Sequence, residues 1–165
     1  MPSILTKTYL HHLEVVKLGY TYGDDTLETA EKAFKAGFAS NFEKYGIVFS
    51  GCAPETSISV DELIEDGKFP DFLGNTSEEL ESRRMLGSQW LKLCREHSFR
   101  LFKRGNSSFF VLTKNDEKVV IDTSNVLVAC VYVLEDRELS SCLFKFNNNM
   151  NWNSEYRHRI FYPQR

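Results

Sequence analysis

The hydrophobic pattern of the first half of the chain is that of amphipathic helices. After Asp25, apolar residues recur every three or four positions as far as Tyr45, and Gly46 follows as a helix stop. Asp25 and Glu28 have the spacing of a capping box, in which side chains bond to backbone amides of the first turn. The pattern therefore predicts a helix over residues 26–45.

Two further segments are expected to be helical. Thr76 and Glu79 form a second capping box, and the apolar positions that follow predict a helix over residues 77–97. Residues 4–18 fit one helical face and are predicted to form a helix, although residues 13–22 could equally run as a strand.

From residue 99 onward the apolar period changes to two and β-forming residues dominate. The predicted strands cover residues 99–103, 108–113, 118–122, 126–134, 142–146 and 156–162, and one earlier strand covers 47–52. Connections of hairpin length between successive strands favour antiparallel pairing.

Helices followed by a meander indicate an α+β fold, with N-terminal helices packed on one face of a C-terminal antiparallel β-meander of about five to six strands. This order of elements is similar to that of cone-shaped domains like nuclear transport factor 2, which implies a curved sheet. The 165 residues are expected to form a single globular domain, 1–165. Its helical half spans about 1–97 and its sheet about 99–163.

Composition excludes several classes of protein. Apolar residues make up 42% of the chain and aromatic residues 13%, so disordered and low-complexity classes are excluded. The longest apolar run, residues 126–134, is too short to span a bilayer. Residues 1–7 lack the basic and apolar regions of a secretory signal, so we expect a cytoplasmic protein with no membrane partner.

No motif predicts a cofactor. Phosphate-binding loops and the GxSxG and HExxH motifs are absent, which argues against P-loop, Rossmann and several hydrolase classes. Cys52, Cys94, Cys130 and Cys142 show neither CxxC spacing nor short disulfide loops. We therefore expect free thiols and no bound metal.

Charge is distributed unevenly along the chain. Residues 55–81 carry nine acidic side chains and one lysine, whereas residues 83–104 carry seven basic side chains and one glutamate. Within the first stretch, residues 54–76 offer only one short helical turn and are predicted to be an exposed acidic excursion.

This excursion suggests the preferred hypothesis, because carboxylates flanked by aromatic anchors suit a basic protein surface. We expect a non-catalytic binding module, an inhibitor of the immunity-protein or antitoxin type, that captures a basic partner such as a toxin or nuclease. The residues predicted to contact that partner are Asp61, Glu62, Glu65, Asp66, Phe69, Asp71, Phe72 and, on an Asn-rich loop, Trp152.

The last predicted strand supports an alternative hypothesis, a small enzyme. Alternation along it places Tyr156, His158 and Tyr162 on one face, where the imidazole would act as acid or base in a pocket between helices and sheet. Arg157 and Arg159 share the other face and form a candidate anion-binding pair.

The basic stretch, residues 83–104, supports a third hypothesis, single-stranded nucleic acid binding, since aromatic residues are interleaved with its basic ones. The net charge of −3 and the adjacent acidic stretch disfavour it. Helical spacing predicts that Trp90 belongs to the core. The oligomeric state stays open between a monomer and a homodimer, the latter formed by edge pairing of the final strand.

Overall fold

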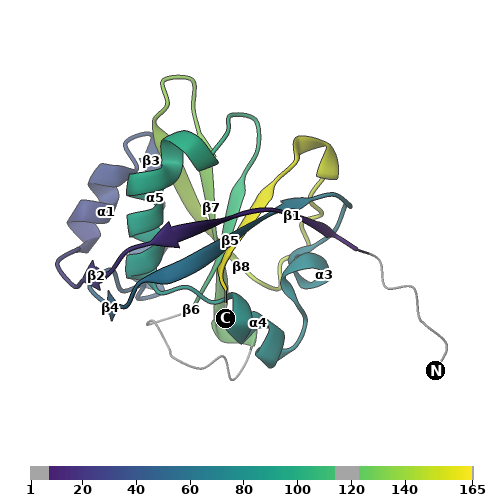
Figure 1. The fold of residues 1–165 in the computed structure, drawn as a ribbon, viewed down its shortest axis with the longest axis horizontal. Coiled ribbons are helices and arrows are strands. Elements are labelled where there is room, and N and C mark those ends of the chain that lie inside the picture. The colour runs from purple at the N-terminus through teal and green to yellow at the C-terminus, as the bar shows by residue number, and fades with distance from the viewer. Residues whose placement is uncertain (1–7, 114–122, 165) are drawn as a thin grey trace.

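The computed structural model describes residues 8–113 and 123–164, which form one large mixed sheet and one small ribbon. The large sheet has seven strands in the order β1-β5-β9-β6-β7-β8-β3 (Figure 1). They are β1 (Leu10–Leu18), β3 (Gly37–Phe38), β5 (Thr56–Leu63), β6 (Ser108–Thr113), β7 (Val126–Val133), β8 (Leu139–Lys145) and β9 (Arg159–Pro163). Neighbouring strands run antiparallel except at β6–β9 and β3–β8. The ribbon pairs β2 (Thr21–Tyr22) with β4 (Cys52–Ala53).

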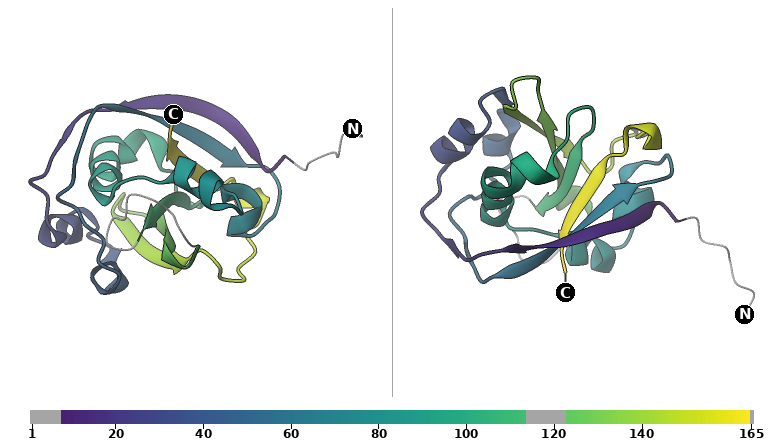
Figure 2. Two further views of the ribbon diagram at one scale, coloured as in Figure 1. Left: turned by 90° about the horizontal axis from the view of Figure 1, so that it is seen from below. Right: turned by 45° about the horizontal axis from the view of Figure 1, so that its top comes forward.

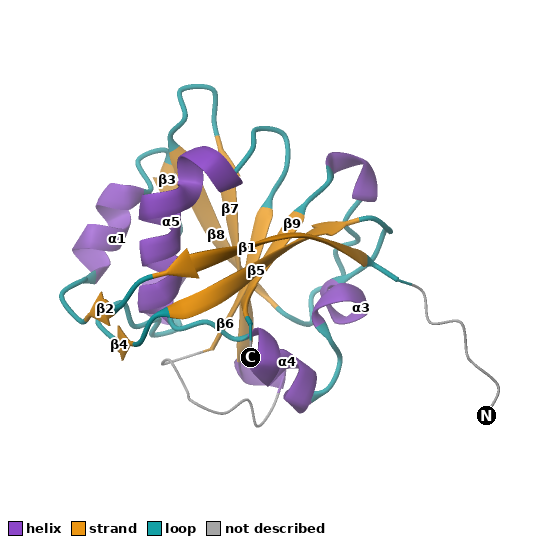
Figure 3. Ribbon diagram, in the orientation of Figure 1, coloured by secondary structure: helices purple, strands orange, loops and turns teal. Residues whose placement is uncertain are grey.

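Helices cover both faces of the sheet, so the described residues form three layers (Figures 1 and 2). The helices are α1 (Leu27–Ala33), α2 (Asn41–Lys44), α3 (Phe69–Leu73), α4 (Ser77–Arg83) and α5 (Gly87–Leu101), with 3-10 turns at Thr123–Asn125 and Ser154–Tyr156. Helices α1 and α5 lie together on one side and α3 and α4 on the other (Figure 3).

The central strands β6 and β7 are buried on both faces, which explains their uninterrupted apolar sequences. Alternation along β6 sends Phe110 and Leu112 into the core under α5, and Phe109 and Val111 into the core under α3 and α4. The sheet thus separates two hydrophobic cores.

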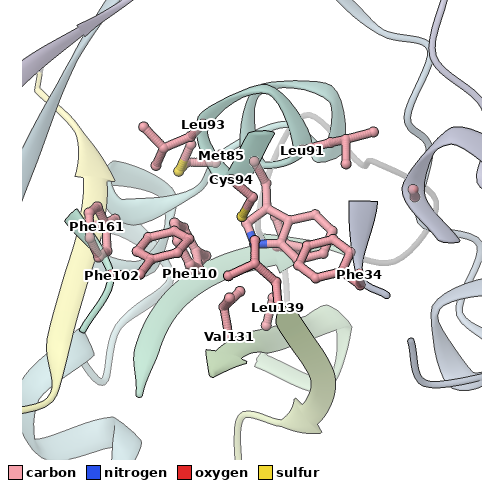
Figure 4. Close-up of a cluster of buried hydrophobic side chains, with 14 of the residues drawn as sticks. Phe34, Met85, Leu91, Leu93, Cys94, Phe102, Phe110, Val131, Leu139 and Phe161 are labelled. Atoms are coloured by element: carbon pink, nitrogen blue, oxygen red, sulfur yellow. The ribbon is translucent and has the colours of Figure 1, made fainter. Parts of the chain in front are cut away.

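The first core is built around Trp90 of α5, as the helical spacing predicted. Its indole ring stacks at 5.0 Å on Phe34 and at 5.1 Å on Phe42, and its plane lies edge-on to Phe110 at 6.3 Å. Figure 4 shows Phe34, Phe110 and Cys94 filling the space between this helix and the sheet.

The second core lies on the opposite face. Phe109 of β6 meets Trp152 at 4.7 Å and Phe69 of α3 at 5.4 Å, both edge to face. The backbone of Trp152 exchanges two hydrogen bonds with that of Gly67, so the loop bearing this tryptophan is fastened to the start of α3.

The predicted fold class is wrong. The sheet is mixed and seven-stranded rather than an antiparallel meander of five to six strands, and helices cover both of its faces. The segment predicted to be a first helix, residues 4–18, forms the edge strand β1 from Leu10 onward, and its residues 4–7 lie outside the described ranges. The similarity to cone-shaped domains like nuclear transport factor 2 depended on that helix-first order and is withdrawn with it.

Residues 54–76 are not an exposed excursion. They contain β5, which lies inside the sheet between β1 and β9, followed by α3. Ile58 and Val60 of β5 are fully buried in the first core. Ser59 and Glu62 have the spacing of a capping box, like the two described above, but they lie within this strand, where side chains alternate between the two faces.

The predicted helix over residues 26–45 is divided into α1, β3 and α2. The four-residue spacing of Phe34, Phe38 and Phe42 does reflect packing, because successive rings stack at 5.7 and 4.5 Å. The chain nevertheless leaves the helix at Phe34, so that Gly37 can pair with β8. In this segment, the helical spacing of the aromatic residues is therefore not accompanied by a continuous helix.

The predicted helix over residues 77–97 is divided into α4 and α5. Thr76 caps α4 as expected, accepting a hydrogen bond of 3.1 Å from the amide of Glu79. The division falls where the amide of Met85 donates to the carbonyl of Val111 in β6. A tertiary hydrogen bond thus replaces a helical one.

Helix α5 restarts at Gly87, where a Cβ atom would lie only 2.2 Å from the carbonyl oxygen of Val48. Glycine permits this close approach of two backbone segments. Residues 47–52 were predicted to form a strand. In the structure, Ile47 and Val48 pack against Gly87, and only Cys52, at the end of the segment, belongs to a strand, β4. The strand predicted over residues 99–103 is wrong, since α5 continues to Leu101.

The later strands were predicted better. The strand at 108–113 is confirmed as β6, and those at 126–134 and 142–146 correspond to β7 and β8. The one predicted at 118–122 lies outside the described residues. The last strand starts at Arg159 rather than 156, and its central place in the sheet leaves it no free edge for a second copy.

Within residues 8–113 and 123–164, no helix is both long enough and apolar enough to span a membrane. The four cysteines are free thiols, as expected: Cys94 and Cys130 are buried, Cys142 is partly buried and Cys52 is exposed.

Candidate functional site

A cleft of about 870 Å³ opens between helices α3 and α4 and the side of the sheet formed by β1, β5 and β9. This volume falls within the range of about 300–1,000 Å³ that small-molecule sites occupy. The polar residues that matter most along its walls are His12, Asp71, Glu79, Arg83 and Tyr162.

Strand pairing brings distant polar side chains together at the floor of the cleft. His12 of β1 lies opposite Asp61 of β5, and Tyr162 of β9 lies opposite Ser59, two residues before Asp61. Residues that face each other across strands share a face of the sheet, as do residues two apart on one strand. The register therefore directs His12, Asp61 and Tyr162 to the same side.

Asp61 is only 5% exposed and is the centre of this cluster. Its Oδ1 lies 2.9 Å from Nδ1 of His12, and its Oδ2 accepts a hydrogen bond of 2.7 Å from the hydroxyl of Tyr162. Nη1 of Arg83 lies 4.0 Å from the same Oδ2. A buried carboxylate needs such partners, because desolvation without them is costly.

Arg83 reaches the cluster from the last turn of α4. Its guanidinium lies over the ring of Tyr162, with Cζ 4.0 Å from the centroid, so the cation is close to both the ring and the carboxylate. Burial raises the pKa of Tyr162, and the hydrogen bond to Asp61 and the charge of Asp61 raise it further. Tyr162 therefore keeps its proton and acts as a hydrogen-bond donor.

The Asp61 carboxylate determines how His12 can react. A carboxylate only accepts hydrogen bonds, so Nδ1 of His12 carries the donated proton, and Nε2 of the neutral ring is left as a proton acceptor. His12 lines the cleft, and its side chain is about half exposed, at 53%. This arrangement can move a proton to or from a molecule bound in the cleft.

The opposite wall of the cleft bears negative charge. Asp71 and Glu79 are exposed there, and Oδ2 of Asp71 accepts a hydrogen bond of 2.8 Å from the amide of Lys68. The cleft thus has Arg83 beside its floor and carboxylates on its facing wall.

The structure separates the residues predicted to bind a basic partner. Asp61 is buried behind His12 and Tyr162, which line the cleft. Phe69, Phe72 and Trp152 are buried in the second core and present no exposed aromatic anchors. Asp66 is exposed and accepts hydrogen bonds from the amide and hydroxyl of Ser154.

The remaining members of that set lie apart. Glu62 is partly buried, with Oε1 4.0 Å from Nε of Arg157, and Glu65 is partly buried in the turn after β5. Asp71 faces the cleft. Capture of a basic protein therefore stays a prediction, without the aromatic anchors that were assigned to it.

The predicted catalytic trio is also divided. His158 is buried, and its Nδ1 accepts a hydrogen bond of 2.9 Å from the amide of Ser107; burial lowers the pKa of this imidazole. Tyr156 is exposed beside it, with ring centroids 5.8 Å apart. Tyr162 lies four residues after His158 along the chain on the same face, where it belongs to the Asp61 cluster. A 3-10 helix, Ser154–Tyr156, keeps Tyr156 out of β9.

The same turn separates the predicted anion-binding pair. Arg157 adopts a left-handed conformation with φ of 52° and is largely exposed. Arg159 is buried, and its Nη1 donates a hydrogen bond of 2.7 Å to the carbonyl of Leu101 at the end of α5. The two guanidinium groups do not form a pair.

Most basic side chains of residues 83–104 have acidic partners, which leaves little net positive surface for a phosphate backbone. The ion pairs are Arg84–Glu81, Lys92–Glu96, Arg95–Asp25, Arg100–Glu14 and Arg104–Glu135.

Sequence reasoning missed His12 and Arg83 as site residues. His12 was placed on a predicted helix, which has no partner strand to bring Asp61 opposite it. Arg83 was counted only as part of a basic stretch. The alternation in residues 56–63 indicates a strand, but it places Asp61 on the polar face with Ser57 and Ser59, so the sequence gives no sign that this carboxylate is buried.

Among the described residues, no group of three or more His, Cys, Asp or Glu side chains is arranged to hold a metal ion. No family model matches the chain, and no curated protein or solved structure is similar to it at a significant level.

Proposed function

We propose that the chain is a small enzyme that performs general acid–base catalysis on a polar small molecule bound in the cleft. The observation that carries this proposal is the contact of 2.9 Å between His12 Nδ1 and the buried carboxylate of Asp61. A carboxylate that fixes one imidazole nitrogen orients the other for proton transfer.

In this mechanism, Nε2 of His12 takes a proton from water or from a substrate hydroxyl, and Asp61 stabilises the imidazolium that forms. The hydroxyl of Tyr162 and the guanidinium of Arg83 hold Asp61 in place. The imidazolium then returns the proton to the leaving group.

The attacking group comes from water or from the substrate. Ser82 lines the cleft, but its hydroxyl donates to the carbonyl of Glu79. Ser59 is buried. Hydrolysis or transfer to a second substrate is therefore the reaction class that the cleft supports best.

The test compares turnover of p-nitrophenyl acetate and p-nitrophenyl phosphate by the intact chain and its variants. Loss of a general acid–base group costs about 10²–10⁴-fold in rate. We expect a loss of that size for His12→Ala and a smaller one for Asp61→Asn. His11→Ala is the matched control, since His11 is its exposed neighbour on the same strand.

Two results would overturn the proposal. One is the absence of turnover of either probe by the intact chain. The other is an equal rate for the His11→Ala and His12→Ala variants. Circular dichroism of each variant shows whether a lost rate reflects chemistry or unfolding.

We also propose a cytoplasmic location. The four free thiols support it, because exposed and partly buried cysteines remain reduced in that compartment. Fractionation of the producing cell tests it.

A further inference from the structure

A second pocket, of about 530 Å³, lies on the described surface away from the cleft, and it shares no lining residue with that cleft. It is bounded by the end of β7, by the loop before β6 and by the segment that precedes β9. Its lining includes Asn106, Tyr132, Met150, Trp152, Tyr156 and His158.

The lining of this pocket is uncharged and includes four aromatic rings, those of Tyr132, Trp152, Tyr156 and His158. It includes no Asp, Glu, Lys or Arg side chain. His158 adds no charge near neutral pH, because burial lowers its pKa. An ion that entered such a pocket would lose hydration without gaining a partner of opposite charge.

One polar group of this pocket is free to meet a bound molecule, Nε2 of His158. Nε1 of Trp152 and Oδ1 of Asn106 also have no hydrogen bond, but both atoms are buried and are not reached from the pocket. Nδ1 of His158 accepts from the amide of Ser107, so in the neutral ring Nε2 carries the proton and is a donor. Buried donors and acceptors normally have partners, and each one left unpaired costs free energy.

Aromatic surfaces surround these groups. The ring centroid of His158 lies 5.4 Å from that of Trp152 and 5.8 Å from that of Tyr156. Tyr156 is 59% exposed, so one side of its ring is open to a bound molecule. Rings of this kind bind flat ligands by stacking and edge contacts.

We propose that this pocket binds an uncharged, planar ring compound that carries a hydrogen-bond acceptor, such as an aromatic amide. The acceptor meets the N–H group of His158. The ring lies against Tyr156. This site is independent of the acid–base function proposed for the cleft.

The test uses three probes of nearly the same shape, measured by titration calorimetry against the full chain. They are benzamide, which is neutral, benzoate, which is an anion, and benzamidine, which is a cation. We expect benzamide to bind at least about tenfold more tightly than either ion, since only the ions lose hydration without compensation.

Two variants locate the binding. Tyr156→Ala removes an exposed ring and is expected to weaken benzamide binding by about tenfold, within the range reported for one stacked aromatic ring. Tyr22→Ala is the matched control, because Tyr22 is also highly exposed but lies on the ribbon, outside the pocket. His158→Phe keeps an aromatic ring, loses the N–H donor and is expected to weaken binding by several fold.

Three outcomes would overturn the proposal. The first is no saturable binding of benzamide up to about 10 mM. The second is equal affinity for the three probes. The third is a dimer, seen by sedimentation, that Tyr156→Ala converts to a monomer, which would make this surface an interface between copies.

Discussion

Tyr162 donates a hydrogen bond of 2.7 Å to Oδ2 of Asp61, although the two residues are 101 positions apart in the sequence. The bond exists because β9 pairs with β5 in a register that sets Tyr162 opposite Ser59. A hydrogen bond to a charged group contributes about 1.5–3 kcal/mol to stability. The contact therefore joins the C-terminal strand to the candidate site.

Replacing Tyr162 by phenylalanine tests this contribution. We expect Tyr162→Phe to lower the free energy of unfolding in urea by about 1.5–3 kcal/mol, because a buried carboxylate oxygen loses its donor. Tyr156→Phe removes a hydroxyl from an exposed tyrosine and is the matched control, with an expected change within about 0.5 kcal/mol. Equal effects of the two changes would show that the bond to Asp61 adds no stability.

The stacked rings of the first core predict a large effect at Trp90. Trp90→Ala removes a fully buried indole that contacts Phe34 and Phe42, and changes of this kind cost about 3–5 kcal/mol. Phe99→Ala, on the same helix, is the control. Its ring is 83% exposed and is expected to contribute no more than about 1 kcal/mol through its contact with Arg137. Urea denaturation of both variants measures the difference.

The sequence was most informative where local pattern and tertiary structure agree. The apolar runs of β6 and β7 identified strands, because a strand buried on both faces needs apolar residues at every position. Trp90 was correctly assigned to the core from its helical neighbours. In both cases the pattern of burial follows from the local secondary structure and can be read from neighbouring residues.

The sequence was misleading where distant pairing determined the element. Residues 10–18 fit a helical face, yet they form β1 because β5 supplies a partner strand. The site depends on that same pairing, since His12 and Asp61 meet only across the two strands. A local pattern carries no information on register between such distant segments, so the acid–base pair could not be predicted.

His158 makes stability depend on pH. Burial holds its folded-state pKa below the ordinary value of 6.5, so the unfolded chain binds the proton more readily. Its contribution is therefore fully present above pH 6.5 and is lost as the pH falls below that value. We expect the free energy of unfolding to decrease between pH 7 and pH 5, as measured by urea titration at each pH.

The His158→Asn variant isolates this residue, because it retains a side-chain acceptor for the amide of Ser107 but does not titrate in this range. We expect a shallower decrease in this variant. His11→Asn, at an exposed histidine, is the matched control. A slope unchanged by His158→Asn would assign the pH dependence to other groups.

Cys142 is expected to be the most acidic thiol of the sheet. It lies opposite Cys130 on β7, and its Sγ is 3.4 Å from the hydroxyl of Tyr132. A hydrogen bond with Cys130 lowers the pKa of Cys142 to about 7; partial burial opposes this and the bond with Tyr132 assists it. Burial raises the pKa of Cys94 and of Cys130.

Alkylation with iodoacetamide tests this order, because the thiolate is the reactive form. In a Cys52→Ser background, which removes the exposed cysteine, we expect one rapidly modified site at Cys142, with a rate that is half-maximal near pH 7. Tyr132→Phe removes one hydrogen-bond donor and is expected to move this midpoint upward. In the Cys52→Ser protein that retains Tyr132, a midpoint near the ordinary thiol pKa of about 8.5 would show that the neighbouring groups do not stabilise the Cys142 thiolate.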